Sequence, residues 1–183
     1  MTGIAAEAAH EAGRQGAMRA RHLLWQVLGS TIDLPFNAYD HGPKLTFSDN
    51  DPQPSQFSFD LRGILRRSDA GRFGGQEAVE VFVEVKAHSS GEGLLTEYRS
   101  FLKRAAVVTS LPAHADSWFI FLAGVPFGTT QGVALCNGSL IAECRQGWPA
   151  PLQQSSDHLH ERLSLVIATQ SFERLLAKWG RNA

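Results

Sequence analysis

The stretch Val79-Glu80-Val81-Phe82-Val83-Glu84-Val85-Lys86 predicts a β-strand near the centre of a sheet. Side chains in a strand alternate between faces, so the valines occupy one face and the other four residues occupy the second. A strand this rich in valine is typical of a sheet interior, where placing an acid beside a lysine is costly. Glu84 and Lys86 are therefore candidate functional residues, because a divalent metal and a phosphate would require both.

A second alternating stretch, residues 56–66, precedes this strand and carries Asp60 on its polar face. The polar connection over residues 68–75 predicts that the two strands pair as a hairpin, which would bring Asp60 close to Glu84 and Lys86. Two neighbouring carboxylates repel each other and favour a cation, and oxygen ligands suit Mg²⁺. Removing either acid is expected to weaken metal binding and to relieve this repulsion in the metal-free protein.

The remaining pattern predicts an α/β domain with a mixed central β-sheet flanked by helices. It comprises a helix over 5–28, a loop over 31–43, a short strand over 44–48, a helix over 94–108, a strand over 118–123, short strand pieces within 131–148 and a helix over 157–179. We expect a single domain over residues 1–183, with its core at about 5–123 and a C-terminal extension that contains the last helix.

Composition limits the classes of function. The chain has 183 residues, of which 43% are hydrophobic, and a formal net charge of -1, so a nucleic-acid partner must be held by a local basic patch. Cys136 and Cys144 fit a reduced, cytoplasmic protein better than a disulfide scaffold. The sequence contains no apolar window of the length that a membrane span requires, so we expect no membrane partner.

Asp60 on one strand, followed by Glu84-Val85-Lys86 on the next, resembles the motif of the PD-(D/E)xK nuclease superfamily. The resemblance covers about residues 5–123 and implies a restriction-endonuclease-like fold. It also implies that Asp60 and Glu84 bind Mg²⁺, with Mn²⁺ as a substitute, and that Lys86 assists the water that attacks a phosphodiester bond.

The chain departs from the family pattern at three places. Phe59 stands where many members have proline, and Leu94 stands where one branch has a glutamine four residues before Tyr98. Many members also use an acid from the first helix. Glu7 and Glu11 are the candidates for that role here, because Gln15 occupies the better-placed position.

Accessory roles are open for several polar residues near the motif. Glu80 and His88 share the face of Glu84. Glu80 fits a surface or salt-bridge role better than a second acid of the site, whereas His88 fits a contact to phosphate or metal-bound water as well as an ordinary position at the strand end. Basic residues that could contact a phosphate backbone, or could simply be solvated, are Arg62, Arg66, Arg99 and Lys103. The tryptophans, Trp25 among them, are expected in the core or at an interface rather than as platforms on which a nucleobase stacks.

The sequence therefore predicts a Mg²⁺-dependent endonuclease, with DNA favoured over RNA as its substrate. The resemblance to the nuclease superfamily implies a role in bacterial antiviral defence, restriction or repair. Cutting both strands of a duplex requires two such sites, so a homodimer is one expected assembly. A separate targeting subunit is the other partner that the sequence leaves open. Two alternatives stay open. One is a catalytically inactive binding or adaptor subunit on the same fold, and the other is an immunity or adaptor protein unrelated to nucleases, with the three residues exposed and apart.

Overall fold

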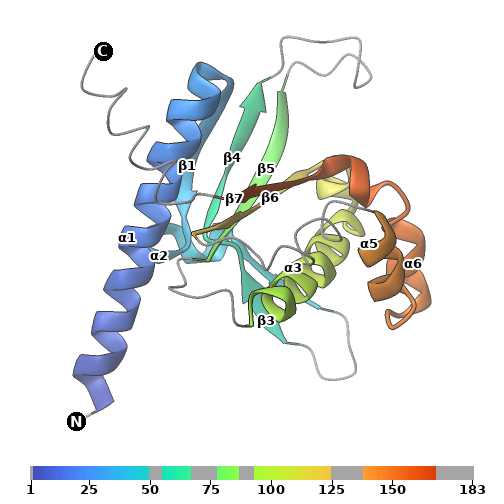
Figure 1. The fold of residues 1–183 in the computed structure, drawn as a ribbon, viewed down its shortest axis with the longest axis horizontal. Coiled ribbons are helices and arrows are strands. Elements are labelled where there is room, and N and C mark those ends of the chain that lie inside the picture. The colour runs from blue at the N-terminus through green and yellow to red at the C-terminus, as the bar shows by residue number, and fades with distance from the viewer. Residues whose placement is uncertain (1, 50–54, 67–77, 87–92, 125–137, 168–183) are drawn as a thin grey trace.

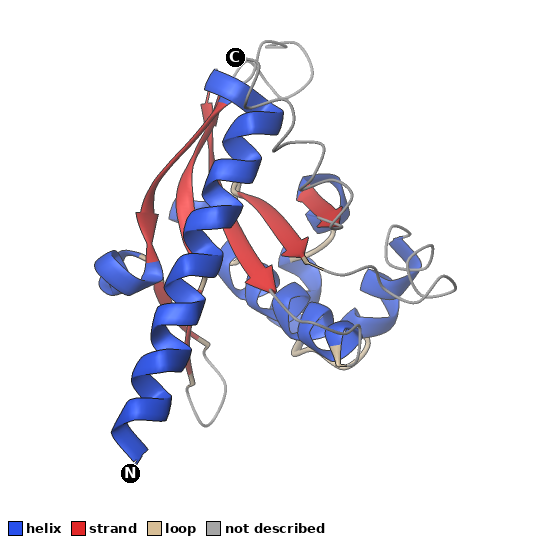
Figure 2. Ribbon diagram, turned by 60° about the vertical axis from the view of Figure 1, so that its left-hand side comes forward, coloured by secondary structure: helices blue, strands red, loops and turns tan. Residues whose placement is uncertain are grey.

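The computed structural model has a five-stranded mixed β-sheet with helices on both faces (Figures 1 and 2). It describes residues 2–49, 55–66, 78–86, 93–124 and 138–167. The strand order is β1-β4-β5-β6-β7, with bounds β1 Ile32–Asn37, β4 Leu61–Arg66, β5 Ala78–Lys86, β6 Trp118–Ala123 and β7 Leu163–Ile167. The first three strands in this order pair antiparallel and the last three pair parallel, which confirms an α/β fold with a mixed sheet.

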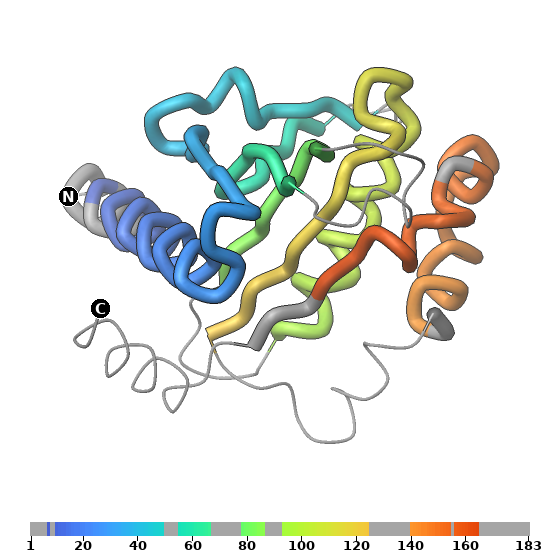
Figure 3. Tube along the Cα trace, turned by 90° about the horizontal axis from the view of Figure 1, so that it is seen from above, coloured from blue at the N-terminus to red at the C-terminus, as the bar shows by residue number. Residues whose placement is uncertain are grey.

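Strand β5 lies at the centre of the sheet and is buried on both faces. Val81 and Val83 pack with helix α1 (Thr2–Leu28), whereas Phe82 packs with helix α3 (Leu94–Thr109). Viewed from above, α1 and α3 lie on opposite sides of the sheet (Figure 3). The predicted helices over 5–28 and 94–108 and the predicted antiparallel β4–β5 pairing are confirmed.

Helix α3 makes the crossover that a parallel β5–β6 pair requires. Its buried stripe includes Tyr98, Phe101, Leu102 and Ala105, at the spacing of one helical face. Burying each large side chain of this kind stabilises the fold by roughly 1.5–3 kcal/mol. The short helix η4 (Pro112–His114) then leads into β6, so α3 connects the end of β5 with the start of β6.

The predicted loop over residues 31–43 is wrong, because this segment supplies the edge strand of the sheet. It forms η1 (Gly29–Thr31), β1, α2 (Ala38–His41) and η2 (Gly42–Lys44). Pro35 lies within β1 and is tolerated because β1 pairs on one side only. Gly63 of β4 allows β1 to approach closely, since a Cβ at Gly63 would overlap the backbone of Asp33.

The predicted strand over residues 56–66 is interrupted at Asp60, the candidate site residue. Residues Gln56–Ser58 form β3, which pairs with β2 (Thr46–Ser48) in a separate ribbon, and β4 begins only at Leu61. Phe59 packs on the α3 side and Leu61 on the α1 side, so the simple alternation fails at Asp60. Asp60 therefore lies at a bend before β4 rather than in the middle of a strand.

The C-terminal region differs most from the expectation. Strand pieces were expected within 131–148, but Gly138–Arg145 forms helix α5, followed by α6 (Ala150–Ser155). The predicted helix over 157–179 is wrong for its first part, which forms η5 (Leu159–Arg162) and β7, and the part from 168 onward lies outside the described residues. Because β7 pairs with β6, the sheet continues beyond residue 123.

Helix α1 is 27 residues long, but neither it nor any other described helix combines the length and apolar character needed to cross a bilayer.

Candidate active site

Asp60 is fixed between the edge strand and the central strand. Its Oδ2 accepts a 2.7 Å hydrogen bond from the backbone N–H of Val85, and its backbone carbonyl accepts a 2.9 Å bond from the N–H of Ala38. Val85 lies between Glu84 and Lys86. The structure thus brings Asp60 to the end of β5, as the sequence predicts.

Glu84 and Lys86 project from the same face of β5 toward α3. Glu84 is 3% exposed, and its Oε1 lies 2.9 Å from Lys86 Nζ and 3.0 Å from an Arg104 guanidinium nitrogen. Its second oxygen, Oε2, is buried and has no hydrogen-bond partner among the described residues. One oxygen of this carboxylate is therefore neutralised by two cations, while the other is left without a ligand.

Glu97, which the sequence analysis missed, is a third acid at the site. It comes from the first turn of α3, and its Oε2 lies 3.1 Å from Lys86 Nζ. The ammonium group is thus held between carboxylates of β5 and α3. The position of Glu97 in the sequence could have identified it, because the first turn of a helix that connects two parallel strands lies close to the end of the first strand.

The pKa values of Asp60 and Lys86 are both raised, but by different causes. Burial, reinforced by the negative charge of Glu84, raises the pKa of Asp60 to about 6, although the Val85 N–H opposes this shift. Burial alone would lower the pKa of Lys86, but Glu84 and Glu97 outweigh it and hold this pKa above its ordinary value. Lys86 is therefore a permanent cation near neutral pH.

A cavity of about 310 Å³ opens beside these residues, and its lining includes Asp60, Lys86 and Glu97. Its remaining lining comes from Val85, from Tyr39 of α2 and from the small residues Ala12, Gly13 and Gly16 of α1. Burial, followed by the charges of Asp60 and Glu84, raises the pKa of the Tyr39 hydroxyl. Tyr39 was also missed, because the segment that carries it was predicted to be a loop.

The donor set fits a hard divalent cation with open coordination positions. Asp60 and the unpartnered Oε2 of Glu84 supply anionic oxygens, and Mg²⁺ commonly binds through one or two carboxylates while it retains water. Among the described residues no group of three or more histidines, cysteines and acids gathers around one point.

Two predicted accessory acids are engaged elsewhere. Glu80 is separated from Glu84 by Phe82 and accepts hydrogen bonds from Arg62, His114 and Ser117. Burial opposes the charge on Glu80, but these bonds outweigh it and lower its pKa. Glu11 bonds to Arg14 and Gln15 along the exposed side of α1, which lowers its pKa to about 2.

His88, the remaining accessory candidate, lies outside the described residues.

The predicted basic residues do not form one patch. Arg62 is paired with Glu80 at 2.6 Å, and Arg99 is paired with Glu143 at 2.9 Å. Lys103 lines a small cavity of about 180 Å³. Arg66 lines a separate, larger cavity on the α1 side of the molecule.

No family model, curated protein or solved structure shows a significant match to this chain. The functional assignment therefore depends on the geometry of the site, since a fold class alone does not determine function.

Proposed function

We propose that this protein is a Mg²⁺-dependent nuclease with a restriction-endonuclease-like fold, hydrolysing DNA phosphodiester bonds. The observation that carries the proposal is the convergence of Asp60, Glu84 and Lys86 at the end of β5, beside an open cavity. The strand arrangement supports it, because an antiparallel β4–β5 pair and a parallel β5–β6 pair joined by α3 follow the order of elements that the sequence motif implies. A cytoplasmic location and a role in defence, restriction or repair accompany the proposal.

Each residue has a distinct role in this mechanism. Asp60 and Oε2 of Glu84 would hold Mg²⁺, which when bound acts as a Lewis acid and lowers the pKa of water. Lys86, kept protonated by Glu84 and Glu97, orients the attacking water and stabilises negative charge that develops on the phosphoryl oxygens. Its raised pKa favours this electrostatic role over that of a general base.

The test is cleavage of plasmid DNA, single-stranded DNA and RNA by the purified protein with Mg²⁺, Mn²⁺ or a chelator. We expect metal-dependent cleavage that Lys86→Ala abolishes. Lys44→Ala, which removes a lysine that lies over the Phe36 ring away from the site, serves as the matched control and should cleave normally. Equal cleavage by wild type and Lys86→Ala would contradict the assignment.

A second candidate function, a catalytically inactive binding or adaptor subunit, is favoured by the ion pairs of Glu84. Its Oε1 already contacts Lys86 and Arg104, so part of the acidic charge is compensated without a metal. Isothermal titration with Mg²⁺ and Mn²⁺ separates the two candidates. Absence of metal binding together with absence of cleavage would favour the adaptor, for which a targeting subunit or a second copy is the expected partner.

A further inference from the structure

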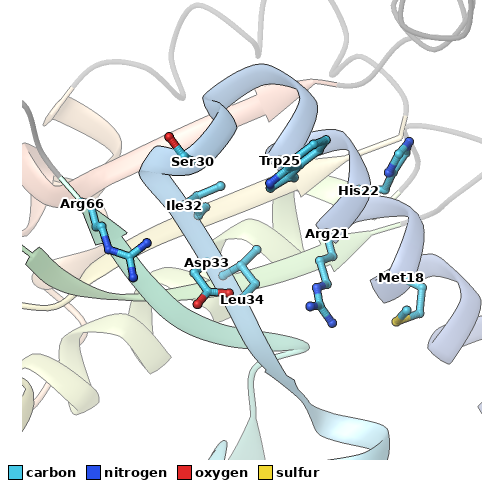
Figure 4. A pocket seen from close by; sticks show the side chains of 9 residues that line it. All are labelled: Met18, Arg21, His22, Trp25, Ser30, Ile32, Asp33, Leu34 and Arg66. Atoms are coloured by element: carbon cyan, nitrogen blue, oxygen red, sulfur yellow. The ribbon is translucent and has the colours of Figure 1, made fainter. Parts of the chain in front are cut away.

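A second cavity, of about 490 Å³, lies between α1, the edge strand β1 and the end of β4. Its lining combines an aromatic ring, basic groups and one acid, and comprises Met18, Arg21, His22, Trp25, Ser30, Ile32, Asp33, Leu34 and Arg66. In Figure 4, Arg66 lies on one side of β1, and Arg21 and Trp25 lie on the other. The catalytic proposal uses none of these residues.

Trp25 is the most unusual member of this lining. Its residue is 57% exposed, which excludes the core position that the sequence analysis allowed for it. Met18, about two turns of α1 earlier on the same flank, is 45% exposed. An exposed indole beside a cavity offers a flat face on which a ring can stack, and burial of that face on binding would be favourable.

The charge around the indole is positive on balance. Arg21 and Arg66 face one acid of the lining, Asp33, and neither arginine forms an ion pair with another described residue. This distinguishes them from Arg62 and Arg99, whose charges are already paired. The Arg21 guanidinium on the indole's side of β1, with that of Arg66 across the strand, matches a nucleobase flanked by phosphates.

We infer that this cavity binds single-stranded nucleic acid, with a base stacked on Trp25 and the adjoining phosphates held by Arg21 and Arg66. The inference rests on the proposed nuclease function, to which it adds a substrate-binding site away from the acids. Arg66 follows Asp60 by six residues along β4, or about 20 Å of extended chain. At roughly 3.4 Å per nucleotide of stacked strand, this separation corresponds to about six nucleotides, and a path over α1 requires more.

Helix α1 lies between the two cavities. Ala12, Gly13 and Gly16 line the catalytic cavity, whereas Met18, Arg21 and Trp25 line the second one. A strand that occupies both must therefore pass over the exposed side of α1. A short oligonucleotide can fill only one of them, so affinity should depend on length.

The experiment is fluorescence anisotropy of labelled oligo-dT of about 4 and about 12 nucleotides, with metal-free protein in chelator so that cleavage plays no part. We expect Trp25→Ala to weaken binding of the longer strand by about fivefold or more, and Trp25→Phe to restore part of the loss. Arg21→Ala and Arg66→Ala should each weaken binding and lower the salt dependence by about one charge. Arg99→Ala is the control for removal of an arginine, and circular dichroism verifies the fold of each variant.

The outcomes separate this inference from the nuclease proposal. If wild type binds the strand but Trp25→Ala and Arg66→Ala behave like Arg99→Ala, or if wild type does not bind it, the inference is overturned whatever the cleavage assay shows. If Trp25→Ala alters the oligomeric state in light scattering and leaves DNA affinity unchanged, this face is a protein interface and the inference is likewise overturned. Loss of binding in the variants without any metal-dependent cleavage by wild type would support the binding site and reject the nuclease.

Discussion

The carboxylate of Asp60 accepts a 2.7 Å hydrogen bond from the backbone N–H of Val85. This bond joins the bend before β4 to the end of β5 and places Asp60 next to the strand that carries Glu84 and Lys86. The same bond stabilises the ionised form of Asp60, yet burial and the charge of Glu84 prevail and raise its pKa to about 6. The site therefore keeps an acid that is poorly accommodated in the absence of a cation.

Asp60→Asn should stabilise the metal-free protein at neutral pH. In the folded protein the pKa of Asp60 is about 6, which is above its ordinary value of 3.8. The contribution of Asp60 to the free energy of unfolding therefore falls as pH rises from about 4 to about 6. Asparagine cannot ionise and retains an oxygen for the Val85 N–H. The free energy of unfolding of the variant relative to wild type should therefore increase by up to about 3 kcal/mol between about pH 4 and about pH 7. Urea denaturation in chelator measures this difference.

Asp49→Asn is the control for that experiment, because its effect on the free energy of unfolding should depend on pH in the opposite direction. Hydrogen bonds from the backbone and side chain of Ser55 lower the pKa of Asp49, so its contribution is present at neutral pH and is lost as pH falls through the lowered value. The Asp49 variant should lose stability at neutral pH relative to acid. A flat pH dependence of the Asp60→Asn difference would show that Asp60 is not strained by burial.

Glu84→Ala should destabilise the metal-free protein, in contrast to Asp60→Asn. Repulsion between the two acids, considered from the sequence alone, predicts a gain on removing either one, but Glu84 is 3% exposed and pairs with Lys86 and Arg104. Removing one partner of a buried ion pair typically costs about 3–5 kcal/mol. Glu143→Ala breaks an exposed pair with Arg99 and should cost less than about 1 kcal/mol. Comparable urea midpoints for the two variants would rule out a structural role for the Glu84 ion pairs.

The parts of the fold that the sequence predicted are those in which one local period dominates. Strand β5 alternates valine with other residues, and α3 repeats apolar residues at helical spacing, so both are determined by their own pattern. Strand β1 was missed because Pro35 reads as a loop residue unless the strand is known to lie at an edge. Strand β7 was read as helix because its apolar run is short and fits either period.

The residues of the candidate site likewise divide into those that the sequence could predict and those that it could not. Asp60, Glu84 and Lys86 could be predicted because two adjacent strands carry them and hairpin pairing brings such residues together. Glu97, Arg104 and Tyr39 could not, because their contacts depend on how α3 and α2 pack against the sheet.

Glu97→Gln should slow cleavage without preventing metal binding. Glu97 lies 3.1 Å from Lys86 Nζ, and its side chain is 40% exposed, so it acts as a positioning residue for the ammonium group with little role in stability. Residues that orient functional groups in this manner typically contribute about 10- to 100-fold to activity. We expect a fall of about tenfold in kcat with unchanged Mn²⁺ affinity by calorimetry. Glu143→Gln is the matched control, and the positioning role is refuted if both variants cleave at the wild-type rate.

Gly13→Ala tests the contact between α1 and Tyr39 that shapes the catalytic cavity. A Cβ at Gly13 would overlap the Tyr39 hydroxyl, so the ring must move and the usual gain of about 1 kcal/mol for alanine over glycine in a helix should be lost. In a Tyr39→Ala background the obstruction is absent, and the same substitution should stabilise the protein. A double-mutant cycle by urea denaturation should therefore give a coupling free energy of about 1 kcal/mol or more between the two positions. Additive effects would show that Tyr39 does not pack over Gly13 in solution and that the cavity is wider than described.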